Sequence, residues 1–103
     1  MKAPSTRQDI RILVNEFIAV PGDKRSDIAE LLDISESGAR LKVPARSAQE
    51  ICFYWCPVAG VSLKLNGRIQ WQKMGMAGIQ FGTLSSREEF FLKALVRSHR
   101  NDG

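Results

Sequence analysis

Histidine and cysteine are scarce in this chain, which has one histidine, His99, and two cysteines among 103 residues. Cys52 and Cys56 are four residues apart in a strand-like segment, which separates them by about 13 Å at about 3.3 Å per residue. This separation is too long for a disulfide, so we expect reduced thiols, as in cytosolic proteins. Because zinc sites need several cysteine or histidine ligands, a metal site is not expected either.

Long apolar segments are also lacking. The longest uninterrupted apolar run is only a few residues, whereas a membrane-spanning helix needs about 20. Residues 1–6 lack the apolar segment of a signal peptide, so the sequence predicts a cytoplasmic protein. Because no nucleophile–base pair, paired carboxylates or phosphate-binding glycine loop is recognisable, we do not expect an enzyme.

The charge balance is basic, with 15 lysines and arginines against 11 acidic residues and a net charge of +4. A basic surface favours an anionic partner without identifying it. The length is that of one domain, and the hydrophobic fraction of 44% is ordinary for a globular protein.

Alternation of apolar and polar residues predicts short β-strands, because successive side chains of a strand point to opposite faces. Val61–Gln72 shows this most clearly, and Gly67 within it is expected to mark a bend or bulge. Turn-forming residues separate the segments. The six expected strands are Ile12–Val20, Ser26–Ser35, Ala39–Val43, Glu50–Cys56 (ended by Pro57), Val61–Gln72 and Ala77–Phe81.

The periodicity becomes helical after Ser85 and Ser86, each of which is followed three residues later by a glutamate, so a capping box is available. One face of this helix is expected to contain Phe91, Ala94, Leu95 and Ser98. The sequence therefore predicts an all-β fold, a small six-stranded antiparallel β-barrel, with one C-terminal α-helix. We expect residues 12–103 to form this domain and residues 1–11 to be a flexible arm.

A polar motif falls where the second expected strand turns into the third. Leu32 and Ile34 alternate with Asp33 and Ser35, so both polar side chains are expected to leave the outer face and form an exposed polar surface. Gly38 would allow a positive φ and the close approach of another molecule. Asp, Ser and Gly are also common in ordinary β-turns, so this motif alone does not identify a site.

A second motif lies upstream, where Arg7 and Arg11 stand four residues apart just before the first expected strand. Arg-x-x-x-Arg followed by Asp-x-Ser-x-x-Gly in a β-rich chain resembles the PilZ domain family, bacterial receptors for the second messenger cyclic di-GMP. The resemblance extends from about Arg7 to the C-terminal helix and implies the same barrel with a helix. It implies a ligand-binding set of Arg7, Arg11, Asp33, Ser35 and Gly38.

The chemistry of these residues suits that ligand, which joins two phosphates to two guanines. Arginine binds phosphate oxygens or the guanine edge bidentately and can stack on a base. Asp33 would accept from guanine N–H groups, and Ser35 would donate to phosphate or brace the loop. Arg40 is a further candidate for a phosphate contact, unless it is an ordinary exposed strand arginine. Trp71 could stack on guanine, although its period places it on the apolar face, where it would pack in the core.

Thr6 stands where some members of the family have a further arginine that goes with two stacked ligand molecules, so one molecule per site is favoured. Ligand binding is expected to order the arm and thereby signal to an unidentified downstream protein of motility, exopolysaccharide or secretion machinery. No cofactor is expected beside cyclic di-GMP itself.

Two alternatives remain open at this point. The chain could be a PilZ-type adaptor that acts by protein contact without nucleotide, although both motifs are intact. It could also be a small barrel that binds single-stranded nucleic acid, as OB-folds and cold-shock domains do, given its basic charge, Tyr54, Trp55 and Trp71. These aromatic residues fall in buried-looking patterns, so nucleic acid is not the expected partner.

Overall fold

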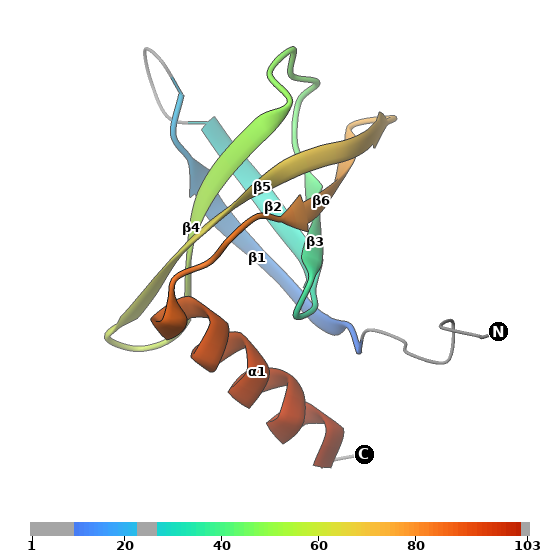
Figure 1. The fold of residues 1–103 in the computed structure, drawn as a ribbon. Helices are drawn as coiled ribbons and strands as arrows, with labels where there is room; N and C mark the ends of the chain where they lie inside the picture. The colour runs from blue at the N-terminus through green and yellow to red at the C-terminus, as the bar shows by residue number, and fades with distance from the viewer. Residues whose placement is uncertain (1–9, 23–26, 102–103) are drawn as a thin grey trace, which may run out of the picture.

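The computed structural model describes residues 10–22 and 27–101, which form six strands and one helix. The strands close into an antiparallel barrel in the order β1-β2-β3-β6-β5-β4, and the helix lies across one end of it (Figure 1). The predicted fold class is confirmed. The elements are β1 (Ile12–Val20), β2 (Asp27–Ile34), β3 (Gly38–Lys42), β4 (Glu50–Val58), β5 (Val61–Lys73), β6 (Met76–Phe81) and α1 (Ser86–Asn101).

The barrel interior is filled by the inward side chains of all six strands, because apolar residues recur at every second position. In β5, Leu63 and Leu65 are fully buried while Lys64 between them is exposed. Gly67 is the next inward position of this strand. A Cβ atom there would lie 2.2 Å from the carbonyl oxygen of Gln80, so β6 approaches too closely for a side chain.

The strand that we expected to stop at Pro57 continues past it, so this boundary was wrong. The pairing of β4 with β5 shifts register between Trp55 and Val58. Proline lacks the N–H that a regular ladder needs and is tolerated at such irregularities. Pro57 therefore marks an irregular part of β4 and not its end.

Helix α1 begins at the expected capping box. The Glu88 N–H donates to Ser85 Oγ at 3.3 Å, and the Ser85 hydroxyl donates to the Glu88 carboxylate. Glu88 also accepts from the Lys64 N–H at 3.1 Å, which joins the helix start to β5. These hydrogen bonds, first that from Ser85 and then that from Lys64, lower the pKa of Glu88.

The face of the helix that contacts the barrel overlaps only in part with the face that we expected. Leu92 and Val96 are buried, Phe91 and Leu95 are partly buried, and Ala94 and Ser98 are exposed. The buried residues lie one and two turns after Glu88, so the anchored carboxylate sets which side of the helix meets the barrel. Within the described ranges, no helix is long and apolar enough to cross a membrane.

Candidate ligand-binding site

A β-bulge sets the direction of the Asp33 side chain. The pairing of β2 with β3 shifts register between Leu31 and Asp33, so one extra residue interrupts the alternation. Leu31 and Ile34 both point into the core, although they are three residues apart. Asp33 is paired with exposed Leu13 on β1 and with Arg40 on β3. Its side chain therefore leaves the outer face of the barrel.

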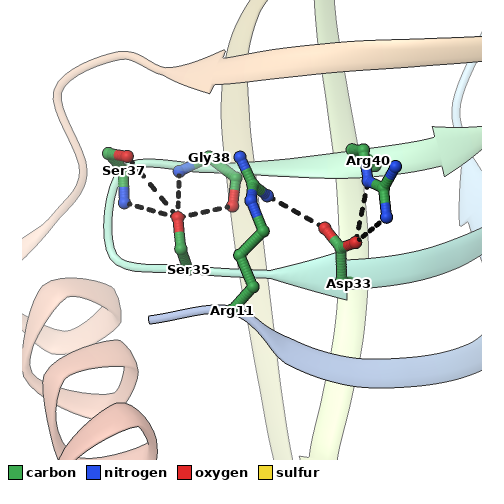
Figure 2. Close-up of polar contacts among 6 residues, drawn as sticks. All are labelled: Arg11, Asp33, Ser35, Ser37, Gly38 and Arg40. Atoms are coloured by element: carbon green, nitrogen blue, oxygen red, sulfur yellow. Dashed lines mark hydrogen bonds and ion pairs between the residues drawn. The ribbon is translucent and has the colours of Figure 1, made fainter. Parts of the chain in front are cut away.

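Two arginines cover the Asp33 carboxylate, one from each neighbouring strand region (Figure 2). Arg11 Nη1 donates to Oδ1 at 2.9 Å, and Arg40 Nε and Nη2 donate to Oδ2 at 2.8 and 2.5 Å. The Asp33 side chain is only 2% exposed, whereas those of Arg11 and Arg40 are 47% and 43% exposed. The expectation of an exposed carboxylate was therefore wrong, because the cross-strand arginines lie over it.

The cluster carries a net positive charge, since two guanidinium groups share one carboxylate. The hydrogen bonds and charge of Asp33 raise the pKa of Arg40 further above its already high ordinary value. A guanidinium has five N–H donors, and Arg40 uses two of them on Asp33. The side chains of Arg11 and Arg40 are thus held in place by Asp33 yet accessible to an anion from solvent.

Ser35 braces the turn between β2 and β3. Its hydroxyl oxygen accepts from the N–H groups of Ser37 and Gly38, each at 3.2 Å, and it donates to the Gly38 carbonyl at 3.3 Å (Figure 2). Its backbone N–H also donates to that carbonyl, at 2.8 Å. We expected Ser35 either to donate to phosphate or to brace the loop. These contacts correspond to bracing, and the buried hydroxyl lies inside the turn.

Gly38 does not use the positive φ that a glycine would allow. Its φ does not lie in the left-handed region, unlike those of Gly60 and Gly75. A Cβ atom at Gly38 would lie 2.1 Å from the carbonyl oxygen of Ile79 on β6. The absent side chain therefore permits close approach of two strands of the barrel itself.

A second bulge turns Trp71 outward. The pairing of β5 with β6 shifts register between Ile69 and Trp71, which reverses the alternation that buries Leu63 and Leu65. Trp71 is 43% exposed and pairs with Gly78. The expectation that its period places Trp71 on the apolar inner face was wrong, because the bulge adds one residue before it.

These features lie in one line across the outer surface. Asp33 pairs with Arg40, Arg40 with Gly78, and Gly78 with Trp71, so the line crosses β2, β3, β6 and β5. A hollow of about 260 Å³ lies along this line. Its walls include Arg11, Gly38, Arg40, Gln70, Trp71 and Gln80.

Sequence reasoning missed Gln70, Gly78 and Gln80. Gln70 Nε2 donates to Gln80 Oε1 at 3.1 Å, across β5 and β6 at the edge of the hollow. Nothing in their local sequence distinguishes them from other outward strand residues. Only the register of β6 against β5 and against β3 could have identified them.

A larger hollow, of about 610 Å³, lies elsewhere on the barrel and includes Arg46, Glu50 and Arg68 in its walls. Arg46 is engaged there by an ion pair with Asp27 at 3.2 Å. Size alone does not make this the better candidate, because none of the expected ligand-binding residues that the structure describes lies in its walls.

The expected arm falls almost entirely outside the described residues. Arg7 and the rest of 1–9 are not described, and the structure places only Ile10 and Arg11 of that segment. Arg11 precedes β1 and reaches Asp33 from there (Figure 2).

A closed barrel with arginines gathered around one carboxylate on its outer surface is a candidate receptor for a small anion. The PilZ domain family model matches residues 5–98, nearly the whole chain, so the chain belongs to the PilZ domain family. Comparison with curated protein sequences found no match.

Among solved structures, the chain is similar to the PilZ domain of CeSA from a cellulose synthesizing bacterium, with a TM-score of 0.63 and 24% identity. That match covers 88% of this chain and 98% of the CeSA domain. At this level of identity the similarity supports the fold, and the function has to be argued from the residues of the site.

Proposed function

We propose that this PilZ domain is a receptor for cyclic di-GMP, which binds over the line from Asp33 to Trp71. The observation that carries the proposal is the pair of accessible arginines, Arg11 and Arg40, fixed on one buried carboxylate beside a hollow walled by an indole. In this proposal Arg7, Ser35 and Gly38 belong to the same site, with Ser35 and Gly38 shaping the turn.

The charge and shape of the site suit the two halves of the ligand. The remaining N–H donors of Arg11 and Arg40 would bind phosphate oxygens or the O6/N7 edge of a guanine. The exposed face of Trp71 would stack on a guanine, as aromatic residues do in other nucleotide sites.

Asp33 can bind the ligand only if its carboxylate exchanges one of its present hydrogen-bond partners for the ligand. Its two oxygens already accept three N–H groups, and its side chain is 2% exposed, so a guanine can reach it only where a guanidinium turns away. Arg11 contributes one of these three hydrogen bonds and Arg40 two. We therefore infer that Arg11 leaves Asp33 for the ligand, and that guanine N–H donors take its place on the carboxylate.

The signal would pass through the N-terminal segment. Arg7 and Arg11 bind the same ligand in this proposal, so binding holds residues 1–11 against the turn between β2 and β3. This changes the surface offered to a downstream protein, which we place in motility, exopolysaccharide or secretion machinery. The protein acts by binding and not as an enzyme.

Isothermal titration calorimetry with cyclic di-GMP tests the proposal, with GTP and cyclic di-AMP as controls. We expect a dissociation constant in the micromolar range or tighter, or about 8 kcal/mol of binding free energy. The expected stoichiometry is one ligand per chain, because Thr6 stands where a further arginine would favour a stacked pair. Absence of binding at millimolar ligand would overturn the proposal and favour an adaptor that acts without nucleotide.

A further inference from the structure

Gly78 occupies the middle of the line, between Arg40 on β3 and Trp71 on β5. A Cβ atom on Gly78 would lie 2.1 Å from Nε1, 2.4 Å from Cε2 and 2.9 Å from Cδ1 of Trp71. All three atoms belong to the five-membered ring of the indole. This ring therefore lies directly against the backbone of Gly78, in the space that a side chain would occupy.

This contact differs from those of the other tightly packed glycines. At Gly38 and Gly67 an added Cβ atom would meet the carbonyl oxygen of a neighbouring strand. At Gly78 the nearest atoms all belong to one side chain, and the φ of Gly78 does not lie in the left-handed region. A substitution at Gly78 should therefore displace Trp71 and leave the strand pairing in place.

We propose that Gly78 is a positioning residue for the ligand. Because Gly78 has no side chain, the Trp71 indole can pack against its backbone in the hollow beside Arg40, where a purine stacks on the indole. This inference rests on the proposed function for the identity of the ligand. With a side chain at Gly78, the indole would be lifted and the stacking face moved away from the guanidinium of Arg40. The residue would thus set the affinity for a flat base without contacting it.

The variant Gly78→Ala tests this directly. In the ¹H–¹⁵N spectrum of the free protein, the Trp71 indole N–H signal, identified by its loss in Trp71→Phe, should shift. The dissociation constant for cyclic di-GMP should rise about tenfold, as expected when stacking on an aromatic residue is lost. Gly82→Ala is the matched control, because its Cβ atom would meet nothing closer than Asn66 Nδ2 at 3.5 Å. Neither measurement should change in Gly82→Ala.

A double-mutant cycle with Trp71→Ala separates positioning from a general effect on the strand. If Gly78 acts through the indole, Gly78→Ala should cause no further loss of affinity once Trp71 is alanine. An equal loss in both backgrounds, or an unmoved indole signal in Gly78→Ala, would overturn the inference. If Gly78→Ala alone fails to fold, the double variant, which lacks the clash, should fold, and its failure to do so would also overturn the inference.

The two proposals can fail separately. If wild-type protein does not bind cyclic di-GMP, the proposed function fails, whereas the shift of the indole signal is measured without ligand and still decides whether Gly78 positions Trp71. If wild-type protein binds but Gly78→Ala binds equally well, the proposed function stands and the role of Gly78 is refuted.

Discussion

Asp33 and Arg40 face each other directly across β2 and β3, and two nitrogens of Arg40 donate to the same oxygen, Oδ2, of Asp33. The turn that joins these strands is braced by Ser35, so the carboxylate and the guanidinium are held by one short hairpin. Arg11, which directly precedes β1, donates to Oδ1. The hairpin of β2 and β3 thus holds Arg40 in position for the ligand. Arg11 comes from the N-terminal segment, which is proposed to carry the signal.

Removal of either arginine should weaken ligand binding without unfolding the barrel. For Arg11→Ala and Arg40→Ala we expect a loss of about 1.5–3 kcal/mol in binding free energy, the range for hydrogen bonds to charged groups. Calorimetric titration measures it. Arg97→Ala, on an exposed position of α1, should bind like wild type. Unchanged titration curves for both site variants would remove this cluster from the binding site.

Asp33→Ala should weaken cyclic di-GMP and reduce the preference for it over cyclic di-AMP. The reason is that guanine has N–H donors on its Watson–Crick edge that a carboxylate accepts, whereas adenine lacks this pattern. The comparison requires dissociation constants for both nucleotides with wild type and variant. An equal loss for the two nucleotides would mean that Asp33 only positions Arg11 and Arg40.

Ligand binding should slow amide exchange in residues 5–11 and in residues 33–38 together. Both segments contact the same molecule in the proposed complex, so their protection should rise with the same ligand dependence. Hydrogen–deuterium exchange with mass spectrometry measures this, and the paired residues 61–69 of β5 serve as an internal reference that should not change. Protection confined to residues 33–38 would refute the proposed role of the N-terminal segment in signalling.

The capping box should stabilise the protein measurably. In Ser85→Ala the Glu88 N–H loses its side-chain acceptor, and we expect a loss of about 1 kcal/mol in the free energy of unfolding. Chemical denaturation measures it. Ser86→Ala, at the next and exposed position, is the control and should change the stability much less.

The same box should make stability depend on acid pH. Because the folded pKa of Glu88 is lowered from its ordinary value of 4.5, its stabilising contribution is present above pH 4.5 and is lost as the pH falls through the lower folded pKa. Between pH 5 and about 2, the melting temperature of Glu88→Gln should therefore decrease less than that of wild type. Exposed Glu89→Gln is the control, and an identical pH profile for Glu88→Gln and wild type would contradict the assignment.

Much of the fold followed from the sequence alone. Alternation in segments such as 61–69 predicted which residues face the core, and the serine–glutamate spacing at Ser85 and Glu88 predicted the helix start. These are local patterns, set by the period of a strand and by the unpaired N–H groups at a helix end. The arginine motif and the Asp-x-Ser-x-x-Gly motif are also local patterns, each within a short stretch of chain, and could therefore indicate the family from the sequence.

The tertiary structure decided what the local patterns could not. Two bulges, before Asp33 and before Trp71, each reverse an alternation by one residue, and such an insertion is defined only against the partner strand. The burial of Asp33 depends on arginines from other segments, and the space for the Trp71 indole depends on Gly78 of β6. The pairs Asp33–Arg40 and Trp71–Gly78 each lie within one hairpin, where the bulge sets the register. Arg11 and Asp33 are distant in sequence, and so are Arg40 and Gly78, so only the closed barrel brings the two hairpins into one line.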